Sequence, residues 1–354
     1  MNSKQPESGN TNPSNSYSRK DFISNEDVRW CPGCGDYSIL AQMQRVMPAI
    51  CSELGIPREN IVFISGIGCS SRFPYYMNTY GFHTIHGRAP TIATGLAVSR
   101  PDLQVWVITG DGDGLSIGAN HLIHCLRRNI DIKILLFNNR IYGLTKGQYS
   151  PTSELGKKTK SSPMGSMESP INPLYTAMVS EATFVARAIA TDSERLQEIL
   201  LRAARHRGAA FVEILQNCNV FNDGAFASFA EKSVMEERTL ILKDGCPLVF
   251  GKKRDKVLKL RGGTHGLEFE IARLDDVPPH KRVMHNEISG NNYLARLLAT
   301  LDETSLPVPL GVFQSIDRPH YGQKLSEQIQ VAREQSGSGN LNEHLHNADT
   351  WTVT

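Results

Sequence analysis

An apolar run that ends in a glycine-rich acidic turn is the feature that most constrains the fold of this chain. Residues 105–114 read VWVITGDGDG, and a β-branched run stopped by glycine is typical of a buried strand ending in a tight turn. Residues 115–128 follow as the predicted helix. Such a unit suits an anion, because glycine lets backbone N–H groups approach and the helix N-terminus adds partial positive charge. The pattern therefore predicts a phosphate site at this turn.

A carboxylate in that turn needs a positive charge beside it if the turn binds phosphate. Asp111 would repel phosphate unless a divalent cation lay between them, and Mg²⁺ prefers carboxylate, neutral oxygen and phosphate ligands. Asn139 follows the next apolar run, 132–137, and offers an amide oxygen. A bare Gly-Asp-Gly can be only a turn, but an EF-hand is excluded by Leu122 at loop position twelve, and a dinucleotide fingerprint by Leu115 at its third glycine.

Length and composition limit the possible fold classes and partners. The chain has 354 residues, 40% of them apolar, which is enough for one large α/β domain with extensions. A net charge of +2 indicates neither nucleic acid nor an anionic membrane as the main partner. No apolar run approaches the roughly 18 residues of a membrane helix, and no signal core is present, so we expect a cytoplasmic protein. Its seven cysteines are then metal ligands, catalytic thiols or buried residues rather than disulfides.

Strand and helix patterns alternate through most of the chain, which predicts a mostly parallel sheet with helices on both faces. Residues 1–20 are predicted to be a disordered tail, 21–235 the binding domain, 236–335 a C-terminal extension and 336–354 a flexible tail. The aperiodic segment 147–173 is long for a loop and is expected to be a lid or a partner contact. Helices are predicted at 37–54, 91–98, 115–128, 193–206 (capped by Ser193), 288–302 and 323–333, and strands at 61–68, 105–108, 132–137, 183–188, 210–215, 240–242, 247–251 and 257–260.

Four cysteines stand where chemistry is expected. Cys31 and Cys34 form a C-x-x-C before a helix, a motif that is ambiguous among zinc, an iron–sulfur cluster and a redox disulfide. Cys69 and Cys218 each follow a predicted strand, as Asp111 and Asn139 do. In an open parallel sheet such strand ends lie along one edge, where ligands bind. Cys69, Cys218, Asp111 and Asn139 are thus predicted to share one functional region. Together with Cys31 and Cys34, the cysteines supply four thiolates, which favour a [4Fe–4S] cluster, with zinc as the alternative.

The joint occurrence of these motifs resembles a known family. The signature at 110–113, followed by Asn138-Asn139, resembles the diphosphate-gripping domain of thiamine-diphosphate enzymes. The segments NRIYGLTKGQ at 139–148 and WCPGCG at 30–35 are similar to the β subunit of 2-oxoacid:ferredoxin oxidoreductases, most closely the 2-oxoglutarate type. The similarity covers roughly residues 25–235.

This resemblance implies a set of ligands. Thiamine diphosphate would contact Ile67, Gly68, Cys69, Ser70, His86, Gly112, Asp113, Gly143 and Leu144. Mg²⁺ would be held by Asp111, Asn139 and the backbone carbonyl of Ile141, and a [4Fe–4S] cluster by Cys31, Cys34, Cys69 and Cys218. Two cations are candidates for catalysis: Arg72 for a substrate carboxylate, which a guanidinium fork fits, and Lys146, pointing towards substrate or coenzyme A. Their alternatives are an ordinary surface arginine and an ordinary loop lysine.

The resemblance also implies an activity and partners. The expected reaction is coenzyme A-dependent oxidative decarboxylation of a 2-oxoacid, ending in acyl-CoA, CO₂ and reduced ferredoxin. The glutamate that activates thiamine would come from a separate α subunit, or from a fused γ–α subunit. Three alternatives stay open: a pyruvate or broad-specificity enzyme, a non-redox thiamine decarboxylase or synthase, and a zinc-bearing assembly subunit.

Overall fold

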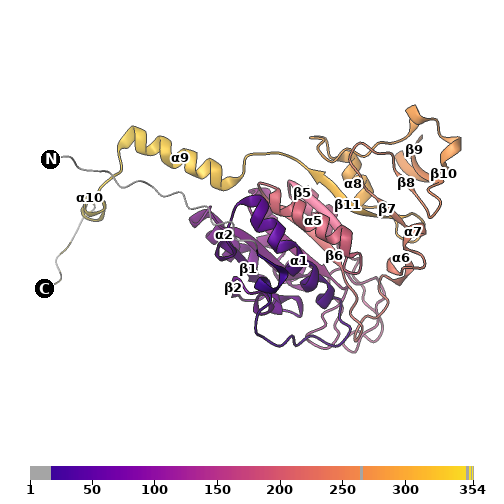
Figure 1. The fold of residues 1–354 in the computed structure, drawn as a ribbon, viewed down its shortest axis with the longest axis horizontal. Helices are drawn as coiled ribbons and strands as arrows, with labels where there is room; N and C mark the ends of the chain where they lie inside the picture. The colour runs from indigo at the N-terminus through magenta and orange to yellow at the C-terminus, as the bar shows by residue number, and fades with distance from the viewer. Residues whose placement is uncertain (1–16, 264–265, 348–350, 352, 354) are drawn as a thin grey trace.

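The computed structural model describes residues 17–263, 266–347, 351 and 353. Within them, eight strands form one sheet in the order β2-β1-β3-β4-β6-β5-β11-β7 (Figure 1). Neighbours from β2 to β5 run parallel, β11 pairs antiparallel with β5, and β7 pairs parallel with β11. The strands are β1 (Ile61–Ser65), β2 (Tyr80–His83), β3 (Gln104–Gly110), β4 (Lys133–Asn138), β5 (Phe184–Ile189), β6 (Ala210–Leu215), β7 (Thr239–Ile241) and β11 (Val308–Ser315).

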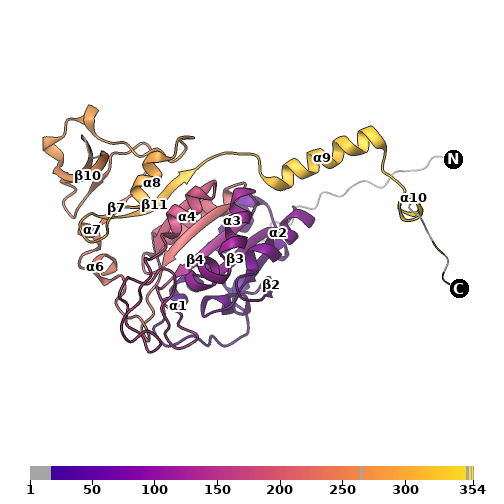
Figure 2. The same cartoon turned by 180° about the vertical axis from the view of Figure 1, so that it is seen from behind.

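Helices cover both faces of this sheet, as the alternating pattern predicted. Apolar side chains of α1 (Asp36–Leu54) and α5 (Ser193–Arg205) pack on one face. The other face, seen in Figure 2, is covered by α2 (Ala89–Ser99), α3 (Ala119–Arg127), α4 (Pro173–Val179) and α8 (Tyr293–Ala299). All residues of β4 and β6 are buried, which explains why both strands appear as continuous apolar runs.

The chain beyond residue 235 is partly built into the main sheet. After α6 (Ala227–Ala230) and α7 (Met235–Arg238), strands β7 and β11 extend the sheet beyond β5. A second, antiparallel sheet lies farther out, with β8 (Val249–Phe250), β9 (Lys256–Gly263) and β10 (Gly266–Arg273). Helix α9 (Tyr321–Ser336) projects from the body, and α10 (Leu341–His346) follows it (Figure 1). The predicted division at 235/236 is therefore not a boundary of the sheet.

Each predicted tail includes residues that the structure describes. Of the predicted N-terminal tail, residues 1–16 lie outside the described residues. Residues 17–20 are ordered, because the Tyr17 ring packs edge-on against Phe22 at 5.6 Å between centroids, and a 3₁₀ helix begins at Arg19. At the other end α10 lies within the predicted flexible tail, of which residues 348–350, 352 and 354 are outside the described part. Among the described helices, none combines the length and the apolar character that crossing a bilayer requires.

Several predicted helix limits need correction. The predicted helix 115–128 is a π-helical turn, Asp113–Ile117, followed by α3 from Ala119, because Gly118 donates to the carbonyl of Asp113 at 3.0 Å. A Cβ on Gly87 would lie 2.6 Å from the Gly118 nitrogen, so two glycines let a neighbouring loop cross this break. The cap of α5 is Asp192 rather than Ser193, since its side chain accepts from the Arg195 N–H.

The predicted helix 288–302 is also shorter than expected, since only α8 is helical there. Strands β2, β10 and β11 were not predicted. The four exposed residues of β2 form a short outer strand with no alternation of burial. Buried β11 is interrupted by Pro309 and Gly311, and proline and glycine count against a strand in a sequence pattern.

A partly buried histidine at the amino end of the sheet gives a pH prediction. Burial, reinforced by Lys133, lowers the pKa of His206 from 6.5 to about 4, and its Nε2 lies 2.7 Å from the Thr183 hydroxyl. Between pH 6.5 and 4 the unfolded chain binds a proton that the folded chain does not. The free energy of unfolding is therefore expected to fall by about 2 kcal/mol from pH 7 to pH 5 through this group alone. Urea titrations of wild type and His206→Gln should show that the variant lacks this slope, and an equal slope in both would contradict the prediction.

Candidate active site

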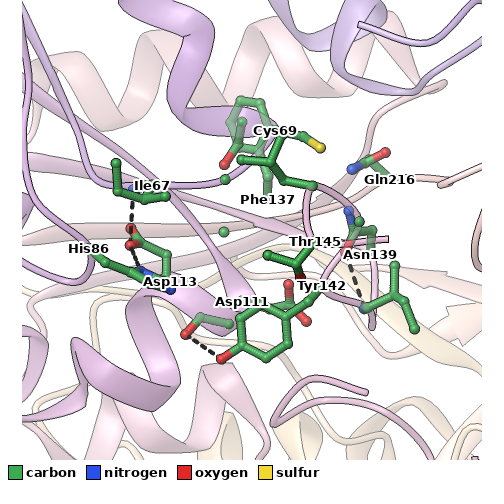
Figure 3. A pocket seen from close by; sticks show the side chains of 17 residues that line it. Ile67, Cys69, His86, Asp111, Asp113, Phe137, Asn139, Tyr142, Thr145 and Gln216 are labelled. Carbon is green, nitrogen blue, oxygen red and sulfur yellow. Dashed lines mark hydrogen bonds and ion pairs between the residues drawn. The ribbon is translucent and has the colours of Figure 1, made fainter. Parts of the chain in front are cut away.

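The carboxyl ends of the parallel strands surround a pocket of about 100 Å³ (Figure 3). Its walls come from the loops that follow β1, β3, β4 and β6 and from the segment around His86. This is the predicted edge of the sheet. Most of the residues predicted to bind cofactor or cation line it: Ile67, Gly68, Cys69, Ser70, His86, Asp111, Gly112, Asp113, Asn139, Ile141, Gly143 and Leu144.

Asp111 and Asn139 are fixed by hydrogen bonds at the ends of β3 and β4. Asp111 Oδ2 accepts from the hydroxyls of Ser150 (2.5 Å) and Thr152 (2.6 Å). Burial raises the pKa of Asp111 to about 6, although those hydroxyls oppose the shift. Asn139 Oδ1 accepts from the Ile141 N–H at 3.2 Å. A carboxylate, an amide and a backbone segment on one pocket are the hard oxygen donors that suit Mg²⁺, and a cation would favour the charged carboxylate.

Asp113 holds the loops around the pocket together. Its buried carboxylate accepts from the backbone N–H groups of Ile67 (3.1 Å) and Gly87 (2.7 Å) and from the Thr109 hydroxyl (2.7 Å). It also lies 2.5 Å from His86 Nδ1. A carboxylate can only accept, so Nδ1 carries the proton, and in the neutral ring Nε2 is then the acceptor. The carboxylate thus fixes the tautomer of a histidine that lines the pocket.

Tyr142 closes the turn that the sequence assigned to diphosphate. Its hydroxyl donates to the Gly112 carbonyl at 3.1 Å. A Cβ on residue 112 would lie 2.1 Å from the Tyr142 ring, so this position requires glycine. Sequence reasoning had not assigned a role to Tyr142, Ser150 or Thr152. The only signal for the two hydroxyls was the run Ser-Pro-Thr-Ser at 150–153 inside an aperiodic loop.

The four predicted thiols line a second pocket, of about 190 Å³. Cys31 and Cys34 precede α1, Cys69 follows β1 and Cys218 follows β6. A Cβ on Gly143 would lie 3.6 Å from the sulfurs of both Cys69 and Cys218, so the absence of a side chain there leaves the space between them open.

These thiols surround a space rather than one point. Among the described residues, no three His, Cys, Asp or Glu side chains are grouped so that they could hold a single metal ion. A zinc ion would need its sulfurs about 2.3 Å away. Burial, followed by the nearby Asp36, raises the pKa of Cys34 above its usual range and that of Cys69 to about 12. The thiolate forms therefore need positive charge at this pocket, and four cysteines around a cavity fit an iron–sulfur cluster.

The two pockets share a wall. Five residues line both: Cys69, Asn139, Gly143, Leu144 and Gln216. The predicted substrate cations, Arg72 and Lys146, line the thiol pocket and are not among the residues that line the pocket of Asp111. Lys146 is exposed and has a left-handed backbone, with φ of 71°.

Comparison with known proteins defines the class and then the family. Residues 66–214 match the family of thiamine pyrophosphate enzymes, C-terminal TPP binding domain, so the chain carries a thiamine-diphosphate-binding domain. It is 54% identical over 337 residues to the 2-oxoglutarate oxidoreductase subunit KorB of Mycobacterium tuberculosis, covering 94% of this chain and 88% of that protein. The chain belongs to the β subunits of the 2-oxoacid:ferredoxin oxidoreductases.

Two further relatives agree with this assignment. A 2-oxoacid:ferredoxin oxidoreductase β subunit of Aeropyrum pernix is 46% identical over 200 residues, which is 56% of this chain and 62% of that one. The solved 2-oxoglutarate:ferredoxin oxidoreductase of Magnetococcus marinus, with 2-oxoglutarate, coenzyme A and succinyl-CoA bound, superimposes with a TM-score of 0.72 at 32% identity. The match covers 95% of this chain and 97% of that chain. The predicted fold class and the family resemblance are confirmed, whereas the roles of individual residues stay predictions.

Proposed function

We propose that this chain is the β subunit of a 2-oxoglutarate:ferredoxin oxidoreductase. Together with an α subunit, or a fused γ–α subunit, it converts 2-oxoglutarate and coenzyme A into succinyl-CoA and CO₂ and passes the electrons to ferredoxin. The observation that carries the proposal is the wall shared by the pocket of Asp111 and the pocket of the four thiols. Neighbouring sites for a decarboxylating cofactor and an electron acceptor suit an oxidative decarboxylase.

The residues of the first pocket divide into three tasks. Asp111, Asn139 and the Ile141 carbonyl would hold Mg²⁺, and Gly112 would let the diphosphate approach the backbone. Asp113 acts through the loops that it ties together and through His86, whose Nε2 is left able to accept a proton in the pocket. Bound thiamine diphosphate supplies the electron sink for decarboxylation, and a bound [4Fe–4S] cluster accepts single electrons.

The residues of the second pocket bind the cluster and anions. Cys31, Cys34, Cys69 and Cys218 would be its ligands. Three cations line the same pocket, Arg29, Arg72 and Lys146, and would offset the negative charge of a thiolate-bound cluster. We assign Arg72 to a substrate carboxylate and Lys146 to substrate or coenzyme A, both reached from this side.

An α subunit would cover the exposed apolar face beside the first pocket. Strand β2 is an outer strand of the sheet, and a free strand edge is usually covered in the working protein. Two apolar side chains of β2 are exposed, Tyr80 by 66% and Phe82 by 49%. Two more are exposed near Gly87, Ile85 by 75% and Ile117 by 50%. Since Ile85 adjoins His86, a partner seated here would reach the cofactor pocket and could supply the carboxylate that activates thiamine.

The proposed redox partner and compartment follow from the thiols. Ferredoxin would take electrons at the cluster, because Cys31 is exposed. All seven cysteines are free. Such a chain suits a reducing compartment, so we place it in the cytoplasm.

The function is tested by anaerobic co-purification with the α subunit, followed by ferredoxin or viologen reduction with a panel of 2-oxoacids. We expect the complex to be most active with 2-oxoglutarate, and the isolated β chain to be inactive because it lacks the activating carboxylate. A preference for pyruvate would replace the substrate assignment. Substantial turnover by the β chain alone would contradict the need for α.

Metal analysis of the same sample separates the remaining alternatives. One zinc without iron or sulfide would favour an assembly subunit. Thiamine-dependent decarboxylation without visible absorbance that dithionite bleaches would favour a non-redox enzyme.

A further inference from the structure

The segment 147–173 contributes a hydroxyl to the metal end of the pocket. Thr152 is buried, and its Oγ1 lies 2.6 Å from Asp111 Oδ2 and 2.9 Å from Asn138 Oδ1. Asp111 follows β3, whereas Asn138 ends β4 and adjoins Asn139. One side chain therefore bridges the ends of the two strands that carry the proposed Mg²⁺ ligands.

The Thr152 bridge lies beyond the last backbone pairing between β3 and β4. The last paired residues of β3 and β4 are Gly110 and Phe137, so both proposed ligands lie beyond the ladder. We propose that Thr152 is a positioning residue. Beyond the last backbone pairing, its hydroxyl holds Asp111 in position relative to Asn139 for binding of the divalent cation. This inference rests on the proposed function, because it requires Asp111 to be a ligand of that cation.

The other end of the bridge is firmly anchored. Asn138 Nδ2 donates to Glu213 Oε1 at 2.7 Å, which turns Asn138 Oδ1 towards Thr152. Glu213 is buried and accepts from Arg187 Nε at 2.7 Å. An ion pair between β5 and β6 thus orients the amide on β4, and the amide orients Thr152 on the loop.

Counting protons shows why a single hydroxyl matters. Ser150 and Thr152 each have one hydroxyl proton, and both lie against Asp111 Oδ2. Asp111 Oδ2 and Asn138 Oδ1 are both acceptors, so Thr152 donates its one proton to only one of them at a time, and Asn138 Oδ1 also accepts from the Arg140 N–H at 3.1 Å. Without Thr152 the carboxylate keeps one hydroxyl partner and loses its tie to β4. Partners of metal ligands usually contribute about 10–100-fold to metal affinity.

The test measures Mg²⁺ dependence rather than turnover alone. In the αβ complex, thiamine diphosphate binding is titrated with Mg²⁺ by calorimetry at a fixed cofactor concentration. Thr152→Val keeps the shape and removes the hydroxyl, so its half-saturating Mg²⁺ concentration should rise about tenfold or more. Thr152→Ser, which restores the hydroxyl, should stay near wild type. Thr159→Val is the matched control, because among the described residues the Thr159 hydroxyl bonds only within its own turn, to Ser161 and Ser162.

Each outcome separates the two proposals. An unchanged Mg²⁺ dependence in Thr152→Val, or equal losses in the valine and serine variants, would overturn the proposed role of Thr152. The metal site itself would still stand if Asp111→Ala abolishes Mg²⁺-dependent binding. Wild-type binding by Asp111→Ala would instead remove the metal site itself. Thr152→Ala serves as a second variant, and failure of both it and the valine variant to assemble with α would assign Thr152 to folding and overturn the inference.

Discussion

Replacing Asp111 by alanine is expected to lower 2-oxoacid turnover by the αβ complex more than about a hundredfold, because loss of a metal ligand should exceed the effect of losing one of its partners. The carboxylate is buried at the end of β3 and supplies the formal charge in the proposed Mg²⁺ site. Without it the cation and the diphosphate would lose their attachment to this strand. Thiamine diphosphate content after gel filtration should therefore fall together with turnover.

The control is an aspartate of the same size outside both pockets. Asp275 is exposed and lines neither site, so Asp275→Ala should keep wild-type turnover and cofactor content. Iron content should be unchanged in both variants, since the thiols stay in place. Full thiamine-dependent turnover by Asp111→Ala would show that the metal is held elsewhere.

Replacing Cys218 by serine is the second change with a large expected effect. Cys218 follows β6 and lines the thiol pocket with Cys31, Cys34 and Cys69, so its loss removes one of four proposed cluster ligands. We expect lower iron and sulfide content, and viologen reduction lowered by more than about a hundredfold because the electrons lose their acceptor. Thiamine diphosphate binding should persist, since Cys218 does not line the first pocket.

Cys246→Ser is the matched control for that experiment. Its thiol is exposed and belongs to neither pocket, so iron content and turnover should equal those of wild type. If Cys218→Ser kept the wild-type iron content and reduced viologen at the wild-type rate, the assignment of Cys218 as a cluster ligand would be wrong.

The sheet core could be predicted because its strands are buried on both faces. β6 has the predicted limits, and β4 is shifted by only one residue, since runs of apolar residues between turns define such strands directly. β11 could not be predicted in this way. Its place beside β5 depends on pairing between residues more than a hundred positions apart, and its proline and glycine hide the strand pattern.

The residues of the site also divide into those that strand ends indicate and those that sequence patterns do not. Asp111, Asn139, Cys69 and Cys218 could be predicted to lie at one edge because strand ends in a parallel sheet meet there, a rule that needs no side-chain detail. Thr152 was missed because a loop without periodicity gives no indication of where its hydroxyls lie. The contact by which Asp113 orients His86 was also missed, because it depends on a π-helical turn that sequence periodicity does not predict.

The most direct test of the account is the transfer of the first electron to the cluster, followed without ferredoxin. Anaerobic αβ complex is mixed with 2-oxoglutarate and coenzyme A while the visible absorbance of the cluster is followed. If the pocket of Asp111 passes electrons across the shared wall to the four thiols, wild type should bleach, whereas Asp111→Ala should retain its iron and not bleach. Formation of succinyl-CoA by an iron-containing complex with no change in absorbance would contradict the account.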